Sequence, residues 1–62
     1  MKVRIEFETD NAAFEDDFDG EVAFVFERAR AHTLETLTHG RPTEHPLRDS
    51  NGNTIGKVEV TE

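Results

Sequence analysis

The segment from Glu21 to Thr38 constrains the fold of this chain more than any other part of its sequence. With successive residues set about 100° apart, seven of its residues, most of them apolar, fall within one sector, which is the pattern of an amphipathic helix. Gly40 and Pro42 follow, as is usual just beyond the end of a helix. We therefore predict a helix over residues 21–38. Its inward-facing sector contains Val22, Val25, Phe26, Ala29, Thr33, Thr36 and Leu37.

Residues 2–8 alternate between apolar and charged side chains, which predicts a β-strand with one buried and one solvent-exposed face. A short helix or helical turn over residues 12–18 is expected next, with Asp10 or Asn11 as its cap. Gly20 is expected to interrupt the chain before the long helix begins.

The C-terminal part predicts a β-hairpin, because Ser50-Asn51-Gly52 lies between the apolar residues Leu47 and Ile55. A two-residue turn would place Arg48 opposite Ile55. A three-residue loop with a left-handed Gly52 is favoured, because it places Leu47 opposite Ile55. Ile55 is then out of phase with the valines that follow, and a bulge at Gly56 would restore the alternation.

The order strand, helix, strand, strand predicts one α+β domain over residues 1–62. One main helix packs on a three-stranded antiparallel sheet (β-α-β-β), and the last strand lies in the centre. The predicted core consists of Val3, Ile5, Phe7, Phe14, Phe18, Val22, Val25, Phe26, Ala29, Leu37, Leu47, Ile55, Val58 and Val60.

The chain has a net charge of −7, and its excess of acidic residues lies in the first half. Residues 5–27 contain nine Asp or Glu and no Lys or Arg, whereas five acids and five bases balance from Arg28 onward. Such a field repels the nucleic acid backbone, whose binding needs basic residues, and attracts a basic surface. We therefore expect a protein partner with a basic surface and no direct binding of nucleic acid.

The residue types needed for catalysis are sparse. There is no cysteine, Ser50 is the only serine, and the carboxylates are expected on exposed faces, where burial cannot tune their pKa. The spacing of His32, His39 and His45 does not give the i, i+4 pair that binds zinc on a helix. We expect no enzymatic activity and no cofactor.

Two acidic segments have the alternating oxygen donors of a cation site. Asp49–Asn53 resembles the start of a calcium loop, but Thr54 stands in place of the required Gly and Val60 in place of the bidentate Glu. Asp17–Glu21 also alternates oxygen donors, but Arg28 occupies its twelfth position. A hairpin loop and a helix start explain the two segments, so no dedicated metal site is predicted; adventitious cation binding at the second stays open.

Two apolar residues lie outside the apolar sector of the predicted helix. Phe24 points about 160° and Leu34 about 120° from its centre. An aromatic residue beside the acidic half of the chain suits protein recognition, with an apolar anchor and a charged rim. The residues predicted to bind a partner are Glu15, Asp16, Asp17, Asp19, Glu21, Phe24 and Glu27.

No apolar run approaches the length of a membrane span, and residues 1–6 lack the apolar region of a signal peptide. These features predict a cytoplasmic protein that does not bind membranes.

Three segments carry a resemblance to a group of proteins: Ile5–Phe14, Gly20–Ala23 and Leu47–Gly56. In these segments the chain resembles small acidic proteins encoded by tailed phages, for which no activity is established. Phe24 departs from the pattern, since a polar residue is more usual there. The resemblance implies an accessory phage protein that acts in the cytoplasm of the bacterial host, and it transfers no functional residue.

The leading functional hypothesis is therefore a non-enzymatic acidic module that binds a basic surface of a host or phage protein. Nucleic-acid mimicry, in which carboxylates stand in for phosphates, is a specific form of this hypothesis. The alternative is a small accessory homodimer that buries Phe24 and Leu34 and has no charge-driven partner.

Overall fold

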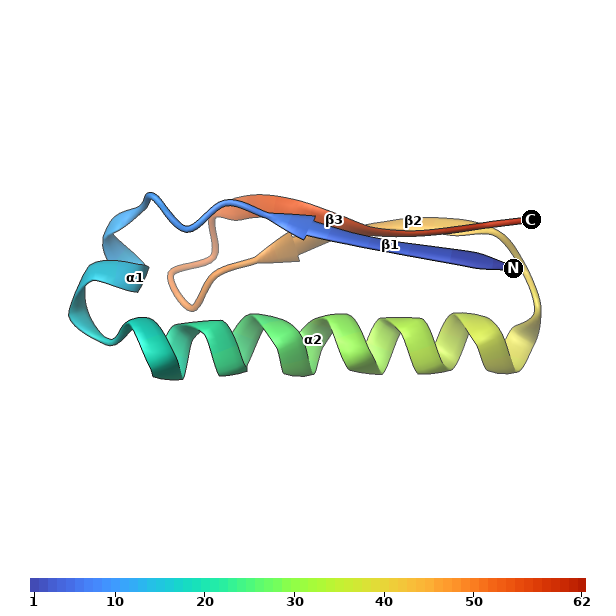
Figure 1. The fold of residues 1–62 in the computed structure, drawn as a ribbon, viewed down its shortest axis with the longest axis horizontal. Helices are drawn as coiled ribbons and strands as arrows, with labels where there is room; N and C mark the ends of the chain where they lie inside the picture. Colours follow the sequence, from blue (N-terminus) through green and yellow to red (C-terminus); the bar gives the residue numbers. More distant parts are fainter.

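The computed structural model describes all 62 residues and confirms the predicted α+β architecture (Figure 1). The elements are β1 (Lys2–Phe7), α1 (Ala12–Asp16), α2 (Phe18–His39), β2 (Thr43–Arg48) and β3 (Thr54–Thr61). The strands form one antiparallel sheet in the order β1-β3-β2, and α2 runs along one face of it. Because α2 spans nearly the whole length of the molecule, the overall shape is elongated, about 37 × 16 × 14 Å.

Helix α2 begins three residues before the predicted start, and Gly20 lies inside its first turn. The prediction that Gly20 interrupts the helix is wrong, because the break falls at Asp17, whose backbone leaves the helical region (φ −150°, ψ 81°). The Asp17 carboxylate caps the helix by accepting a hydrogen bond from the Gly20 N–H, at 3.0 Å. A side chain at position 20 would collide with that carboxylate, so glycine makes room for the cap.

The other end of α2 is as predicted. Gly40 adopts the left-handed conformation, with φ 73°, and its N–H donates to the Thr36 carbonyl at 2.8 Å. This bond satisfies one of the carbonyl groups left free by the end of the helix.

The β2–β3 hairpin has the predicted three-residue loop, and Gly52 is left-handed with φ 87°. The predicted bulge, however, lies one residue earlier. Arg48 pairs with Thr54 and Leu47 pairs with Gly56, so Ile55 is the extra residue and Leu47 does not face it. Gly56 is needed for another reason: β1 passes so close that a side chain there would meet the Glu6 carbonyl and the Phe7 backbone.

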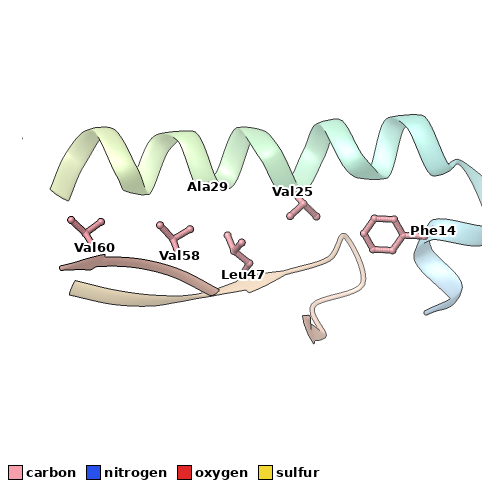
Figure 2. Close-up of a cluster of buried hydrophobic side chains, with 6 residues drawn as sticks. All are labelled: Phe14, Val25, Ala29, Leu47, Val58 and Val60. Atoms are coloured by element: carbon pink, nitrogen blue, oxygen red, sulfur yellow. The ribbon is translucent and has the colours of Figure 1, made fainter. Parts of the chain in front are cut away.

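The buried core lies between α2 and the two strands of the hairpin, as Figure 2 shows. Every element except β1 contributes to it, through Phe14, Val25, Ala29, Leu47, Val58 and Val60. Phe7, Val22 and Ile55 from the predicted core are half-buried against its edge.

Five residues predicted to be in the core are instead exposed: Val3, Ile5, Phe18, Phe26 and Leu37. For all of these except Phe18, which lies at the junction of α1 and α2, the reason is the lateral position of α2, which packs over β2 and β3 and makes little contact with β1. The inner face of β1 and the flank of the helix beside it are therefore left open to solvent.

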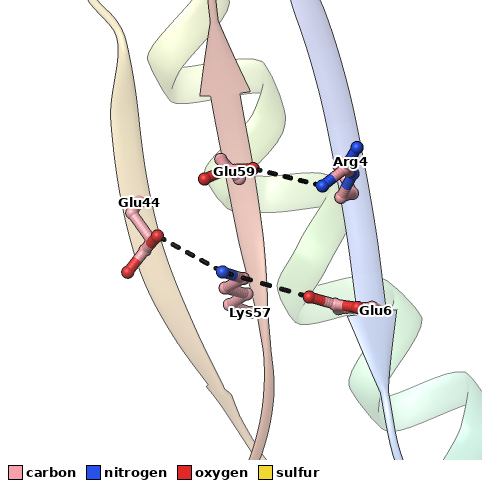
Figure 3. A network of polar contacts seen from close by, with 5 residues as sticks. All are labelled: Arg4, Glu6, Glu44, Lys57 and Glu59. Carbon is pink, nitrogen blue, oxygen red and sulfur yellow. Dashed lines mark hydrogen bonds and ion pairs between the residues drawn. The ribbon is translucent and has the colours of Figure 1, made fainter.

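The outer face of the sheet is charged, and its side chains form a network across all three strands (Figure 3). Lys57 on the central strand lies between Glu44 (3.5 Å) and Glu6 (4.0 Å), and Arg4 pairs with Glu59 at 4.0 Å. Exposed pairs of this kind each stabilise a fold by about 0–1 kcal/mol. Neither helix combines the length and the apolar composition needed to cross a bilayer.

Candidate functional site

Four of the predicted site residues come together where α1 meets α2, at the end of the molecule opposite both termini (Figure 1). Glu15, Asp16, Asp17 and Asp19 are all exposed there, and we refer to them as the acidic end. None of them forms an ion pair, because every ion pair in the structure uses an acidic residue from another part of the chain. Their charge is therefore not neutralised within the molecule.

Local structure explains why these carboxylates can lie so close together. The break at Asp17 turns the chain sharply between the two helices, and the side chain of Asp17 caps α2. Asp19 lies in the first turn of α2, where the helix dipole favours negative charge. The start of α2 therefore offsets part of the repulsion within the acidic end.

Phe18 is the aromatic residue of this surface, although its spacing from Phe14 predicted a place in the core. Its side chain is 58% exposed, between Asp17 and Asp19. One edge of the ring is held by Phe14, in a T-shaped contact with ring centroids 6.0 Å apart. The acidic end thus includes an exposed apolar side chain that contacts the buried ring of Phe14.

Glu21 was predicted to bind a partner, but its side chain faces inward and is only 7% exposed. Its carboxylate accepts hydrogen bonds from the Ser50 N–H at 2.7 Å and the Ser50 hydroxyl at 2.6 Å. The expectation that this carboxylate is exposed is wrong, because the hairpin loop folds back onto the start of α2. Glu21 therefore joins α2 to the loop.

Asp49, in the hairpin loop, is the second buried carboxylate of the molecule, at 3% exposure. Its side chain accepts hydrogen bonds from the backbone N–H groups of Asn51 and Asn53, both at 2.9 Å, and from the amide of Asn11 at 2.5 Å. Burial acts to raise the pKa of Asp49, but these hydrogen bonds outweigh it and lower the pKa below its ordinary value. Asp49–Asn53, the segment that resembles the start of a calcium loop, is thus a hairpin loop held by hydrogen bonds to the Asp49 carboxylate. No group of three or more His, Asp or Glu side chains is arranged to hold a metal ion.

Phe24 does not project into solvent, so the expected exposed anchor at this position is wrong. Its side chain is half-buried against the core, and the Arg28 guanidinium lies over the ring, 5.0 Å from its centroid. Both line a hollow of about 330 Å³ between α2 and the hairpin, together with His32, His45 and Arg48. Phe24 therefore lines a hollow with four basic side chains and the Asp49 carboxylate, and no residue of the acidic end lines it.

Within this hollow the rings of His32 and His45 lie against each other, with centroids 3.3 Å apart and ring planes tilted by 31°. Burial lowers the pKa of His45, and the neighbouring His32 and Arg48 lower it further, while Glu35 acts in the opposite direction. The sequence spacing gave no sign of this pair, because the two histidines come from α2 and β2.

Glu27, the last predicted site residue, lies on the exposed side of α2 and pairs with Arg30 at 3.4 Å. It is two turns along the helix from Asp19 and does not belong to the acidic end. Leu34, which the homodimer hypothesis paired with Phe24, is 58% exposed.

Comparisons with protein-family models, with curated proteins and with solved structures give no match for this chain.

Proposed function

We propose that this chain is a non-enzymatic protein-binding module whose acidic end engages a basic surface of another protein. One observation carries the proposal: four exposed carboxylates without basic partners lie in the same α1–α2 segment as an exposed phenylalanine, Phe18, which two of them flank in the sequence. Charge around an apolar anchor is an arrangement that protein interfaces use for recognition.

The charge of the acidic end would act mainly on the rate of association. Glu8 and Asp10, in the connection from β1 to α1, are also exposed and unpaired, so they extend the same field. Complementary fields raise association rates several orders of magnitude, and the effect falls steeply with ionic strength. Phe18 would act differently, because an apolar side chain that becomes buried in the partner slows dissociation.

Nucleic-acid mimicry is the specific form of this proposal. Carboxylates at the junction of α1 and α2 can occupy a groove of the partner that normally binds phosphates. The protein then competes with the nucleic acid for that groove. The proposed setting is a bacterial cytoplasm, with a host or phage protein as the partner.

The proposal is tested by binding from a bacterial lysate to the immobilised protein, followed by elution with increasing salt. The site variant E15Q/D16N/D19N removes three charges and leaves the Asp17 cap intact. The matched control E27Q/E44Q/E62Q also removes three charges, from α2, β2 and the C-terminus. We expect the parent and the control to retain the same basic protein and the site variant to lose it.

Equal loss in both variants would show that only net charge matters, and it would contradict a localised site. F18A removes no charge. If F18A weakens binding of the partner while the salt dependence of binding stays as in the parent, the result supports the anchor role of this side chain.

A further inference from the structure

Strand β1 forms an edge of the sheet that α2 does not cover. Its inward-facing residues Val3 and Ile5 are 36% and 40% exposed, which is unusual for apolar side chains on the core side of a sheet. Phe26, at 53% exposure, lies on the flank of α2 beside this strand, because its ring contacts Phe7 with centroids 5.6 Å apart. An apolar strip therefore follows the free edge.

The backbone of β1 is in the right phase to accept another strand. The Glu8 N–H donates to the Ile55 carbonyl of β3 at 2.9 Å. Because antiparallel strands alternate the direction of their backbone groups, Val3, Ile5 and Phe7 direct their N–H and C=O groups away from β3. These groups lie along the open edge, where a further strand would find donors and acceptors.

The opposite edge of the sheet is protected. The Asp49 N–H points toward β3, where it donates to Asn53, so the same alternation places Pro46 at an outward-facing position of β2. Proline has no N–H to offer, and its presence on an edge strand blocks pairing with another chain. Only β1 is left as an edge that can extend the sheet.

The charges on the outer face of β1 identify the strand that would fit. Lys2 and Arg4 occupy its first half, and Glu6 and Glu8 its second half. A strand that is basic and then acidic is complementary to its own antiparallel copy. We propose that a second copy of this chain pairs with β1 through β1 of its own, with Ile5 at the two-fold axis.

This register satisfies backbone and side chains together. Ile5 faces Ile5 of the other copy and Val3 faces Phe7, so each facing pair can exchange both of its N–H···O=C bonds. On the outer face Arg4 comes opposite Glu6, and Lys2 opposite Glu8. Opposite charges on facing residues stabilise a strand pair, and like charges destabilise it.

The neighbouring registers fail by the same criteria. A shift by two residues in one direction places Arg4 opposite its own copy at the axis, and a shift in the other direction places Glu6 there. A shift by one residue brings edge-facing backbone groups opposite groups that are already bonded to β3. The Ile5-centred register is therefore the one that the sequence of β1 supports.

The side chains required are free to form this interface. Arg4 and Glu6 each have one neighbour of opposite charge within their own chain, at 4.0 Å and on the exposed face, where such pairs are weak. The acidic end lies beyond the C-terminal end of β1. None of the four residues of the acidic end takes part in the strand pairing. The interface therefore leaves the four residues of the acidic end free, and Glu8 is the one residue that it shares with the surrounding acidic field.

The test is a charge reversal followed by complementation, measured by sedimentation equilibrium of the full chain over a range of protein concentrations. The parent should show a reversible monomer–dimer equilibrium. In an R4E dimer, the introduced glutamate of each copy faces Glu6 of the other copy. In an E6R dimer, the introduced arginine of each copy faces Arg4 of the other copy. Each variant alone should therefore lose about tenfold or more in dimer affinity.

An equimolar mixture of R4E and E6R should recover association, because position 4 of one chain then faces the opposite charge at position 6 of the other. Recovery in the mixture also shows that both variants are folded. The control is E44R, which makes the same charge change as E6R on the same face but at the protected β2 edge, and it should dimerise like the parent.

A parent that stays monomeric at all concentrations would overturn the proposal. So would R4E and E6R dimers as tight as the parent dimer, or a mixture that associates no better than either variant alone.

Discussion

The Glu21 carboxylate accepts hydrogen bonds from both the N–H and the hydroxyl of Ser50, and so ties the first turns of α2 to the tip of the β2–β3 hairpin. Removal of this carboxylate should destabilise the fold. We expect E21A to lower the free energy of unfolding by about 1–3 kcal/mol, because the Ser50 N–H then loses its partner.

Urea unfolding provides the measurement, with S50A as the comparison. That variant removes only the hydroxyl bond, so it should lower the free energy of unfolding by about 1 kcal/mol. If E21A unfolds at the same urea concentration as the parent, the bond between α2 and the hairpin does not contribute to stability.

Gly56 should tolerate no side chain, because the β1 backbone fills the space that a Cβ would need. We expect G56A to displace β1 and to lower the melting temperature more than G52A does. At Gly52 there is open space and only the left-handed backbone disfavours alanine, by about 1–2 kcal/mol. Thermal unfolding followed by circular dichroism compares the two, and a smaller effect for G56A would contradict the close approach of β1.

His45 should make stability depend on pH near neutrality. Its folded pKa is lowered, by burial first and then by His32 and Arg48, so the unfolded chain binds the proton more readily. The stabilisation is therefore complete above the unfolded pKa of about 6.5 and is lost as the pH falls through the lower folded pKa. Urea midpoints measured from about pH 8 down to about pH 5 should fall in the parent and fall less in H45Q. Parallel profiles for the two proteins would exclude His45 as the source.

Asp49 should act in a separate and more acidic range. Burial opposes its ionisation, but hydrogen bonds from Asn53, Asn51 and Asn11 lower its folded pKa. Its stabilisation is therefore present above the unfolded pKa of about 3.9 and is lost as the pH falls through the lower folded value. D49N should lose this acid-dependent component, as measured by the same unfolding series below about pH 5. An unchanged acid profile would contradict the role of this carboxylate.

The elements of this fold could be predicted because their signals are local. The apolar sector of α2, the alternation of β1 and the turn at Gly52 each depend on residues close together in the sequence. The long helix also ended where Gly40 predicted. Its start differs from the prediction because Gly20 does not break the helix and instead makes room for the Asp17 cap.

The lateral position of α2 could not be predicted, and most of the errors follow from it. A helix with a wide apolar sector can sit over either pair of adjacent strands, β1 and β3 or β3 and β2, and the pattern of β1 shows only that the strand has an apolar face. The choice of β2 and β3 exposes Ile5 and Phe26 and draws Phe24 toward the hairpin.

The candidate site was predictable only where its residues are close together in the sequence. The acidic end is contiguous in sequence, so Asp16, Asp17 and Asp19 were found together. Glu21 belonged to the same acidic run, but its burial depends on the fold-back of the loop at Ser50, which is distant in sequence. Phe18 was assigned to the core because it lies one turn from Phe14, a spacing that does not show which of the two rings is covered.

The central claim is that the acidic end, and not the net charge of the chain, recruits a basic partner. Its most direct test is the association rate of the retained partner with the parent, E15Q/D16N/D19N and E27Q/E44Q/E62Q, measured over a range of ionic strength. Exposed charges are screened within about 10 Å at 0.1 M salt, so association with the parent and with the control should slow steeply as salt increases. The site variant should associate more slowly at low salt and depend less on salt. If it associates as fast as the parent at low salt, the acidic end is not the binding surface.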